Sequence, residues 1–178
     1  MSNRDNLSVL HEEDLGKFVV YGDLNCPFCF ALHERFNSWD LLSRVEWRLI
    51  VHAPELSEAA FSLEDESLLA NEVFAIHHRA PDVEVSLPKR RPGSSLATRL
   101  VMAISQYASD KAPELRLALY RALWQNGLDL ANWMCWKPAY AKRDWGSSLI
   151  SIRKLKRATV IPWSVGSSGN CWARNPKN

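Results

Sequence analysis

Two cysteines separated by two residues, Cys26 and Cys29, have the clearest potential for chemistry in this sequence. A C-x-x-C pair can exchange electrons with a disulfide, it can supply half of a tetrahedral zinc site, or it can be chemically inert. Exchange requires a thiolate, so the pKa of the attacking cysteine must fall below its usual value of about 8.5. The segments on either side of the pair therefore decide between these interpretations.

The flanking residues predict that the pair lies where a strand leads into a helix. Residues 17–23, KFVVYGD, are rich in β-branched and aromatic side chains and predict a buried strand. Pro27 suits the first position of a helix, and the pattern that follows predicts a helix to about residue 38. Cys26 then lies at the positive end of the helix, which stabilises a thiolate. Cys29, one turn further on, is expected to be more buried and to resolve a mixed disulfide.

A zinc site is the first competing interpretation. Histidines and cysteines elsewhere in the chain are the candidate zinc partners: His33, His77, His78, Cys135 and Cys171. Their spacing is poor, because the sequence has no second C-x-x-C and no H-x-x-x-H. Redox chemistry is therefore favoured over zinc, and no metal ligand is assigned.

The other polar residues near the pair give weaker signals. His33, one turn beyond Cys29, is either a polar neighbour of the pair or an exposed helix residue, and the second interpretation is favoured. His77 and His78 are interpreted as surface residues, because adjacent helix positions cannot face one site. Asp23 either acts as a polar neighbour of the thiols or closes the turn, and both roles stay open. Cys135 and Cys171 are interpreted as lone small hydrophobes.

The rest of the chain predicts a second strand and then a long helical region. Residues 45–51, VEWRLIV, predict the strand, which gives β, α, β within the first 55 residues. Helices are predicted at residues 62–80, 94–110, 113–127, 129–136 and 141–157, and a strand hairpin at 161–173. The predicted organisation is an N-terminal extension at 1–16, a helical insertion at 57–157, and a domain formed by 17–56 with 158–178.

Composition excludes several classes of protein. The net charge of +2 is too small for the concentrated positive field of a nucleic-acid binder. The longest apolar runs fall short of the roughly 20 residues that cross a bilayer, so no membrane association is expected. Residues 1–16 lack the apolar core of a secretion signal, and four cysteines are too few for a disulfide framework. A cytoplasmic location is the expectation.

The run VVYGDLNCPFCFALHERF resembles the active-site opening of the DsbA-like thioredoxin superfamily. VEWRLIVHAPEL is similar to the second strand of that family, and VIPWSVGSSGNCWARN to the segment with its cis-proline and closing hairpin. The resemblance spans nearly all of residues 17–175. It implies an α/β protein with a thioredoxin-like fold and an all-helical inserted domain, with substrate held between the two.

The resemblance also implies roles for individual residues. Cys26 is the expected nucleophile and Cys29 the resolving thiol. Pro162 is the expected cis-proline facing them, which leaves the backbone of Ile161 to pair with an extended substrate peptide. Pro27 and Phe28, between the cysteines, are expected to contact substrate. The two spacers offer no polar side chain to the thiolate, so the reduction potential is expected nearer thioredoxin's, about −270 mV, than DsbA's, about −120 mV.

The subgroup that the chain most resembles includes 2-hydroxychromene-2-carboxylate isomerases and kappa-class glutathione transferases. Those branches typically carry serine at the first active-site position, where this chain has Cys26. A thiol–disulfide oxidoreductase is therefore the leading hypothesis. The alternatives are a glutathione-dependent isomerase or transferase of small aromatic substrates, and a binding module that has lost turnover.

The expected partners follow from the leading hypothesis. The substrate is a disulfide-containing protein or a small thiol, with no bound cofactor and with glutathione as an alternative reductant or co-substrate. Relatives usually continue beyond the position of Asn178 into one more helix that covers the central sheet. Three explanations for this difference stay open: another element covers the sheet, a second subunit covers it in a homodimer, or the chain is shortened.

Overall fold

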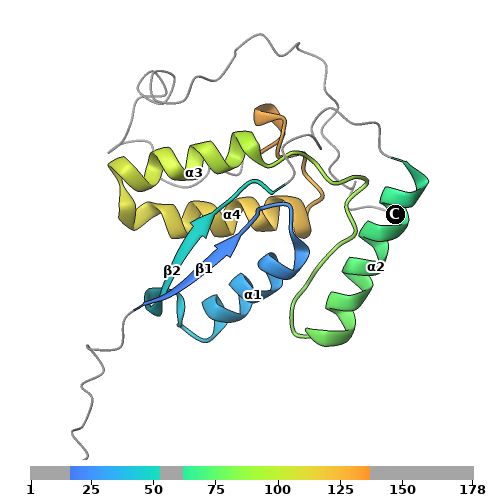
Figure 1. The fold of residues 1–178 in the computed structure, drawn as a ribbon, viewed down its shortest axis with the longest axis horizontal. Coiled ribbons are helices and arrows are strands. Elements are labelled where there is room, and N and C mark those ends of the chain that lie inside the picture. The colour runs from blue at the N-terminus through green and yellow to red at the C-terminus, as the bar shows by residue number, and fades with distance from the viewer. Residues whose placement is uncertain (1–16, 53–61, 137–178) are drawn as a thin grey trace, which may run out of the picture.

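The computed structural model describes residues 17–52 and 62–136, and it contains a small parallel sheet and several helices (Figure 1). The elements follow in the order β1 (Phe18–Gly22), α1 (Pro27–Ser38), the 3-10 turn η2 (Leu42–Arg44), β2 (Val45–Leu49), α2 (Leu63–Arg79), α3 (Ser95–Tyr107), the 3-10 turn η4 (Ser109–Lys111) and α4 (Ala112–Trp124). This is a mixed α/β arrangement, as the sequence predicts.

The strands β1 and β2 pair in parallel and are connected through α1. The register runs from Phe18 opposite Val45 to Gly22 opposite Leu49. The second strand ends two residues earlier than predicted, although the Ile50 N–H still donates to the carbonyl of Gly22 at 3.0 Å. The predicted order β-α-β is therefore confirmed. The prediction that the first strand is buried is wrong, because Phe18, Val19 and Tyr21 of β1 are exposed and only Gly22 is buried.

The predicted helices between residues 62 and 127 are also confirmed, with defined ends. Ser62 caps α2 through a reciprocal capping box with Asp65. Gly127 has φ of 66°, the left-handed conformation that follows the end of α4. The helix predicted at 129–136 begins later than expected, at residue 133, where the Asn132 side chain accepts the N–H of Met134 at 3.0 Å. Asp129 instead closes the preceding turn, accepting the N–H of Ala131 at 2.9 Å.

The described elements share one hydrophobic core. Helix α1 contacts both α2 and α4, and α3 packs along α4 (Figure 1). The largest fully buried side chains include Phe30 of α1 together with Tyr120 and Trp124 of α4. Two side chains of α1 form ion pairs with the helical region, Glu34 with Arg121 of α4 at 2.6 Å and Arg35 with Asp82, in the turn after α2, at 2.5 Å. The predicted helical region thus packs directly against the strand–helix–strand unit.

Several predictions concern residues outside the described ranges. These are the extension at 1–16, the helix at 141–157, the hairpin at 161–173, and the domain ends at 56/57 and 157/158. Within the described part of the chain, no helix combines the length and the apolar character needed to cross a membrane.

Candidate active site

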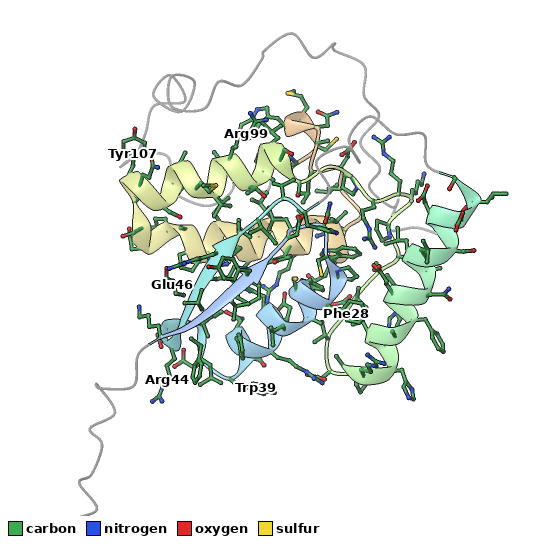
Figure 2. The ribbon with its side chains drawn as sticks, viewed as in Figure 1. Phe28, Trp39, Arg44, Glu46, Arg99 and Tyr107 are labelled. Atoms are coloured by element: carbon green, nitrogen blue, oxygen red, sulfur yellow. The ribbon has the colours of Figure 1, made fainter. Side chains whose placement is uncertain are left out.

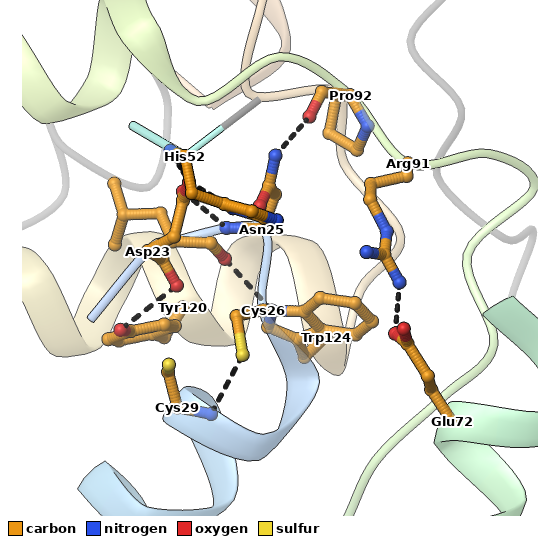
Figure 3. A network of polar contacts seen from close by, with 11 residues as sticks. Asp23, Asn25, Cys26, Cys29, His52, Glu72, Arg91, Pro92, Tyr120 and Trp124 are labelled. Atoms are coloured by element: carbon orange, nitrogen blue, oxygen red, sulfur yellow. Dashed lines mark hydrogen bonds and ion pairs between the residues drawn. The ribbon is translucent and has the colours of Figure 1, made fainter. Parts of the chain in front are cut away.

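Cys26 is the residue that caps α1, at the end of the loop from β1 (Figure 3). Its backbone is extended, with φ −99° and ψ 115°, and Pro27 follows as the first helical residue. The Cys26 Sγ accepts the backbone N–H of Cys29 at 3.4 Å. A serine or aspartate oxygen usually takes this acceptor role at a helix start. The prediction that Cys26 lies at the N-terminus of a helix is confirmed.

The two cysteines form a near pair at 3.0 Å without a disulfide. The pKa of Cys26 is lowered to about 6, chiefly by a hydrogen bond from the Cys29 thiol. Burial raises this pKa, and hydrogen bonds from the backbone N–H groups of Cys29 and Phe28 lower it further. The same hydrogen bond raises the pKa of Cys29, and burial adds to the effect. At neutral pH the pair therefore holds one thiolate and one thiol. Both side chains are half-buried, so hydrogen-bond direction, rather than the expected difference in burial, distinguishes them.

Asp23 fixes the loop that delivers Cys26, and it also acts on the thiol pair. Its carboxylate, only 2% exposed, accepts the N–H of Asn25 at 3.1 Å and the N–H of His52 at 2.9 Å, and the His52 ring Nδ1 lies 3.0 Å away. Its carbonyl oxygen accepts the N–H of Cys26 at 3.1 Å. The negative charge of Asp23 contributes to the raised pKa of Cys29. Both roles left open by the sequence therefore apply.

Two aromatic side chains of α4 donate hydrogen bonds to the same loop (Figure 3). The Tyr120 hydroxyl donates to the carbonyl of Asp23 at 3.2 Å, and the Trp124 Nε1–H donates to the carbonyl of Leu24 at 3.0 Å. The two donors are four residues apart, so they lie on one face of α4. Sequence reasoning did not find this support, nor the contact of His52 with Asp23. The available signal was the pair of aromatic residues with polar tips at helical spacing.

His33 is fully buried, so its interpretation as an exposed helix residue is wrong. It lies on the face of α1 that packs against α4 and β2, with its ring 4.9 Å from that of Trp47 and 5.4 Å from that of Tyr120. Its Nε2 accepts a hydrogen bond from Arg116 Nε at 2.9 Å. Burial, together with the nearby arginine charges, lowers the pKa of His33 to about 3. His77 and His78 are exposed, as predicted.

An ion pair between Glu72 of α2 and Arg91 lies on another side of the cysteine pair (Figure 3). The charge of Glu72 is among the influences that raise the pKa of Cys26. The loop after Arg91 reaches the active-site turn, because Asn25 Nδ2 donates to the carbonyl of Pro92 at 3.4 Å. The helical region therefore contributes charged groups to the surroundings of Cys26.

The remaining predicted site residues differ in their exposure, and two of them lie outside the described part of the chain. Phe28 is 41% exposed on the first turn of α1, whereas Pro27 is buried (Figure 2). Ile161 and Pro162 lie outside the described residues. Cys135 is buried and disulfide-bonded, so its interpretation as a lone hydrophobe is wrong.

Among residues 17–52 and 62–136, no three His, Cys, Asp or Glu side chains come together in a group that could hold a metal ion. No family model and no curated protein matches this chain.

Proposed function

We propose that this protein is a thiol–disulfide oxidoreductase, with a thioredoxin-like fold of the DsbA-like kind. The observation that carries the proposal is the environment of Cys26, whose sulfur caps α1 and accepts hydrogen bonds from both the backbone and the thiol of Cys29. These interactions lower the pKa of Cys26 to about 6, so the thiolate is its main form at neutral pH. A cysteine buried only for packing has no need of such an arrangement.

The proposed reaction has two exchange steps. The Cys26 thiolate attacks one sulfur of a substrate disulfide, which forms a mixed disulfide and releases the other substrate sulfur as a thiolate. Cys29 then loses its proton to water and attacks the Cys26 sulfur, which breaks the mixed disulfide and releases the second substrate thiolate. Two electrons pass to the substrate, and a disulfide between Cys26 and Cys29 remains. The same steps in reverse oxidise a dithiol.

The proposed substrate is a disulfide-containing protein or a small thiol. Exposed Phe28 beside the nucleophile supplies an apolar surface for such a substrate. Pro27 acts by starting the helix. As the resemblance implies, Ile161 and Pro162, which lie outside the described residues, are proposed to bind an extended substrate peptide. Glutathione is proposed as a reductant.

The reduction potential is proposed to lie closer to that of thioredoxin, about −270 mV, than to that of DsbA, about −120 mV. A lower pKa of the nucleophilic thiol accompanies a more oxidising pair, with about 7 in thioredoxin and about 3.5 in DsbA. The value of about 6 for Cys26 is nearer the first. Titration of the protein in glutathione buffers measures the potential, and a value close to that of DsbA would overturn this part of the proposal.

Disulfide exchange with glutathione disulfide tests the proposed activity directly. The reduced protein is expected to consume glutathione disulfide, Cys26→Ser to be inactive, and Cys29→Ser to accumulate a mixed disulfide with Cys26, visible as a mass increase. Full turnover by Cys29→Ser with glutathione and an aromatic substrate would instead favour an isomerase or transferase. Loss of any difference between wild type and Cys26→Ser would identify a binding module.

A further inference from the structure

Arg116 is a buried cation without a carboxylate partner in the described part of the chain. Its side chain is only 7% exposed, and its Nε donates to the neutral ring of His33 at 2.9 Å. The guanidinium also lies over the Trp47 ring, 5.6 Å from its centroid. Burial lowers the pKa of Arg116 to about 10, which still leaves it charged at neutral pH. Burying an uncompensated charge costs folding free energy, so its retention calls for a reason.

The packing of α1 against α4 places this charge behind the cysteine pair. Cys29 and His33 are four residues apart on α1, and Arg116 and Tyr120 are four residues apart on α4, so each pair shares a helix face. His33 contacts both α4 residues, Arg116 by its hydrogen bond and Tyr120 by its ring.

The Tyr120 hydroxyl marks the end of this packing nearest the active site. It shares an acceptor, the Asp23 carbonyl oxygen, with the N–H of Cys26. Arg116 lies four residues before Tyr120 on α4, about 6 Å along the helix axis. The ring of Tyr120 is buried, so little water screens the electrostatic interaction between the Arg116 charge and the thiols.

Charged and titratable groups face the thiols from every packed element. They are Asp23 and His52 beside the loop, Glu72 and Arg91 from the helical region, and Tyr120 from α4, with Arg116 one turn further along α4 against His33. The carboxylates of Asp23 and Glu72 each oppose a thiolate, and each has a partner of its own, the His52 ring at 3.0 Å from Asp23 and the Arg91 guanidinium on Glu72. Arg116 differs because no carboxylate among residues 17–52 and 62–136 pairs with it.

We propose that Arg116 acts as an electrostatic residue of the active site, stabilising the Cys26 thiolate through the protein interior, with His33 as the neutral residue that holds the guanidinium in position. The inference rests on the proposed function of the cysteine pair. The reduced protein has a thiolate that partly compensates the charge of Arg116, whereas the disulfide form has none. Arg116 therefore favours the reduced form and makes the pair more oxidising.

The direct test removes the charge and keeps the volume. In Arg116→Met, the pKa of Cys26, measured by pH-dependent alkylation, is expected to rise by about one unit. At pH 7 the equilibrium with glutathione then moves about fivefold toward the disulfide form, because less of the reduced protein is thiolate. Arg116→Lys, which retains a positive charge, is expected to restore most of both values. A purely structural role for Arg116 would move neither in this charge-dependent way.

A second pair of variants neutralises the charge instead of removing it, in case Arg116→Met does not fold. His33→Glu supplies a carboxylate to Arg116, so it is expected to raise the pKa of Cys26 as Arg116→Met does. His33→Gln keeps a neutral acceptor and is expected to stay within about 0.3 unit of wild type.

The outcomes separate this inference from the proposed function. An unchanged pKa of Cys26 in folded Arg116→Met or His33→Glu would overturn the role of Arg116 alone. The same holds if Arg116→Lys behaves like Arg116→Met. A wild-type pKa of Cys26 near 8.5 would overturn the proposed function itself.

Discussion

The Tyr120 hydroxyl lies 3.2 Å from the carbonyl oxygen of Asp23, and this hydrogen bond fastens α4 to the turn that carries the reactive cysteine. The same oxygen accepts the N–H of Cys26. A residue in the middle of the helical region therefore helps to set the backbone of a residue near the start of the chain.

Removing only this hydroxyl, in Tyr120→Phe, is expected to lower the free energy of unfolding by about 1 to 2 kcal/mol, because a buried hydrogen bond is lost while the ring packing stays. Chemical denaturation of the reduced protein measures the change. Tyr107→Phe is the matched control, since Tyr107 is 60% exposed at the end of α3 (Figure 2) and should change little. Equal effects of the two substitutions would contradict the assigned role of the hydrogen bond.

The reactivity of Cys26 is expected to follow a pKa of about 6. Only the thiolate reacts with iodoacetamide, so the alkylation rate should be half-maximal near that pH and level off about 1.5 units above it. In Cys29→Ser the largest cause of the lowered pKa, the hydrogen bond from the Cys29 thiol, is altered, and the midpoint should move upward. Mass spectrometry of the modified peptide assigns the rate to Cys26.

The stability of the reduced protein is expected to depend on pH through the same group. The pKa of Cys26 is lower in the folded state, about 6, than the usual value of about 8.5 in the unfolded chain. Between these values the unfolded state binds more protons, so stability rises with pH and is lost as pH falls through 6. The gain from pH 5.5 to 7.5 should be about 1 to 2 kcal/mol. Cys26→Ser should lack it, and an identical pH profile in that variant would rule out this linkage.

Glu72→Gln is expected to lower the pKa of Cys26 by about 0.3 to 0.5 unit, because the substitution removes a negative charge that opposes the thiolate and releases Arg91 from its ion pair. Arg91→Met should shift the pKa in the opposite direction. Glu66→Gln, an exposed position on the same helix, is the control for general charge effects. A shift of equal size in the control would mean that the charge of Glu72 does not act specifically on Cys26.

Gly22→Ala is expected to destabilise the protein by about 1 to 3 kcal/mol through overpacking. An added Cβ would lie 2.8 Å from the ring of Trp47 on β2, and that ring is buried against His33 of α1 and Tyr120 of α4. Thermal unfolding followed by tryptophan fluorescence measures the loss. If the clash is the cause, Gly22→Ala combined with Trp47→Phe should cost less than the sum of the two single changes.

Much of the fold was accessible from sequence because its signals are local. The strand before Cys26, the proline after it and the helices predicted at 62–80 and 113–127 each depend on neighbours in the chain, and all are found close to where they are predicted. The N-terminal position of Cys26 followed from the same signals. Local chemistry therefore located the reactive thiol.

The residues that surround the thiol could not be found in this way. His33 looked like a surface residue because its burial depends on how α1 meets α4, which helical spacing alone does not specify. The contacts of Tyr120 and His52 with Asp23 join segments 97 and 29 residues apart. Such pairings become visible only once the helices are placed against the sheet.

The reactive sulfur of Cys26 is also the cap of its own helix, so the order of the first turn of α1 differs between the reduced and the oxidised protein. In the reduced protein the N–H of Cys29 has a thiolate acceptor, and that acceptor loses its charge whenever Cys26 enters a disulfide. The amide hydrogen of Cys29 should then exchange faster with solvent in the oxidised protein. The redox state of the cysteine pair therefore sets the local mobility of the first turn of α1, beside the exposed ring of Phe28.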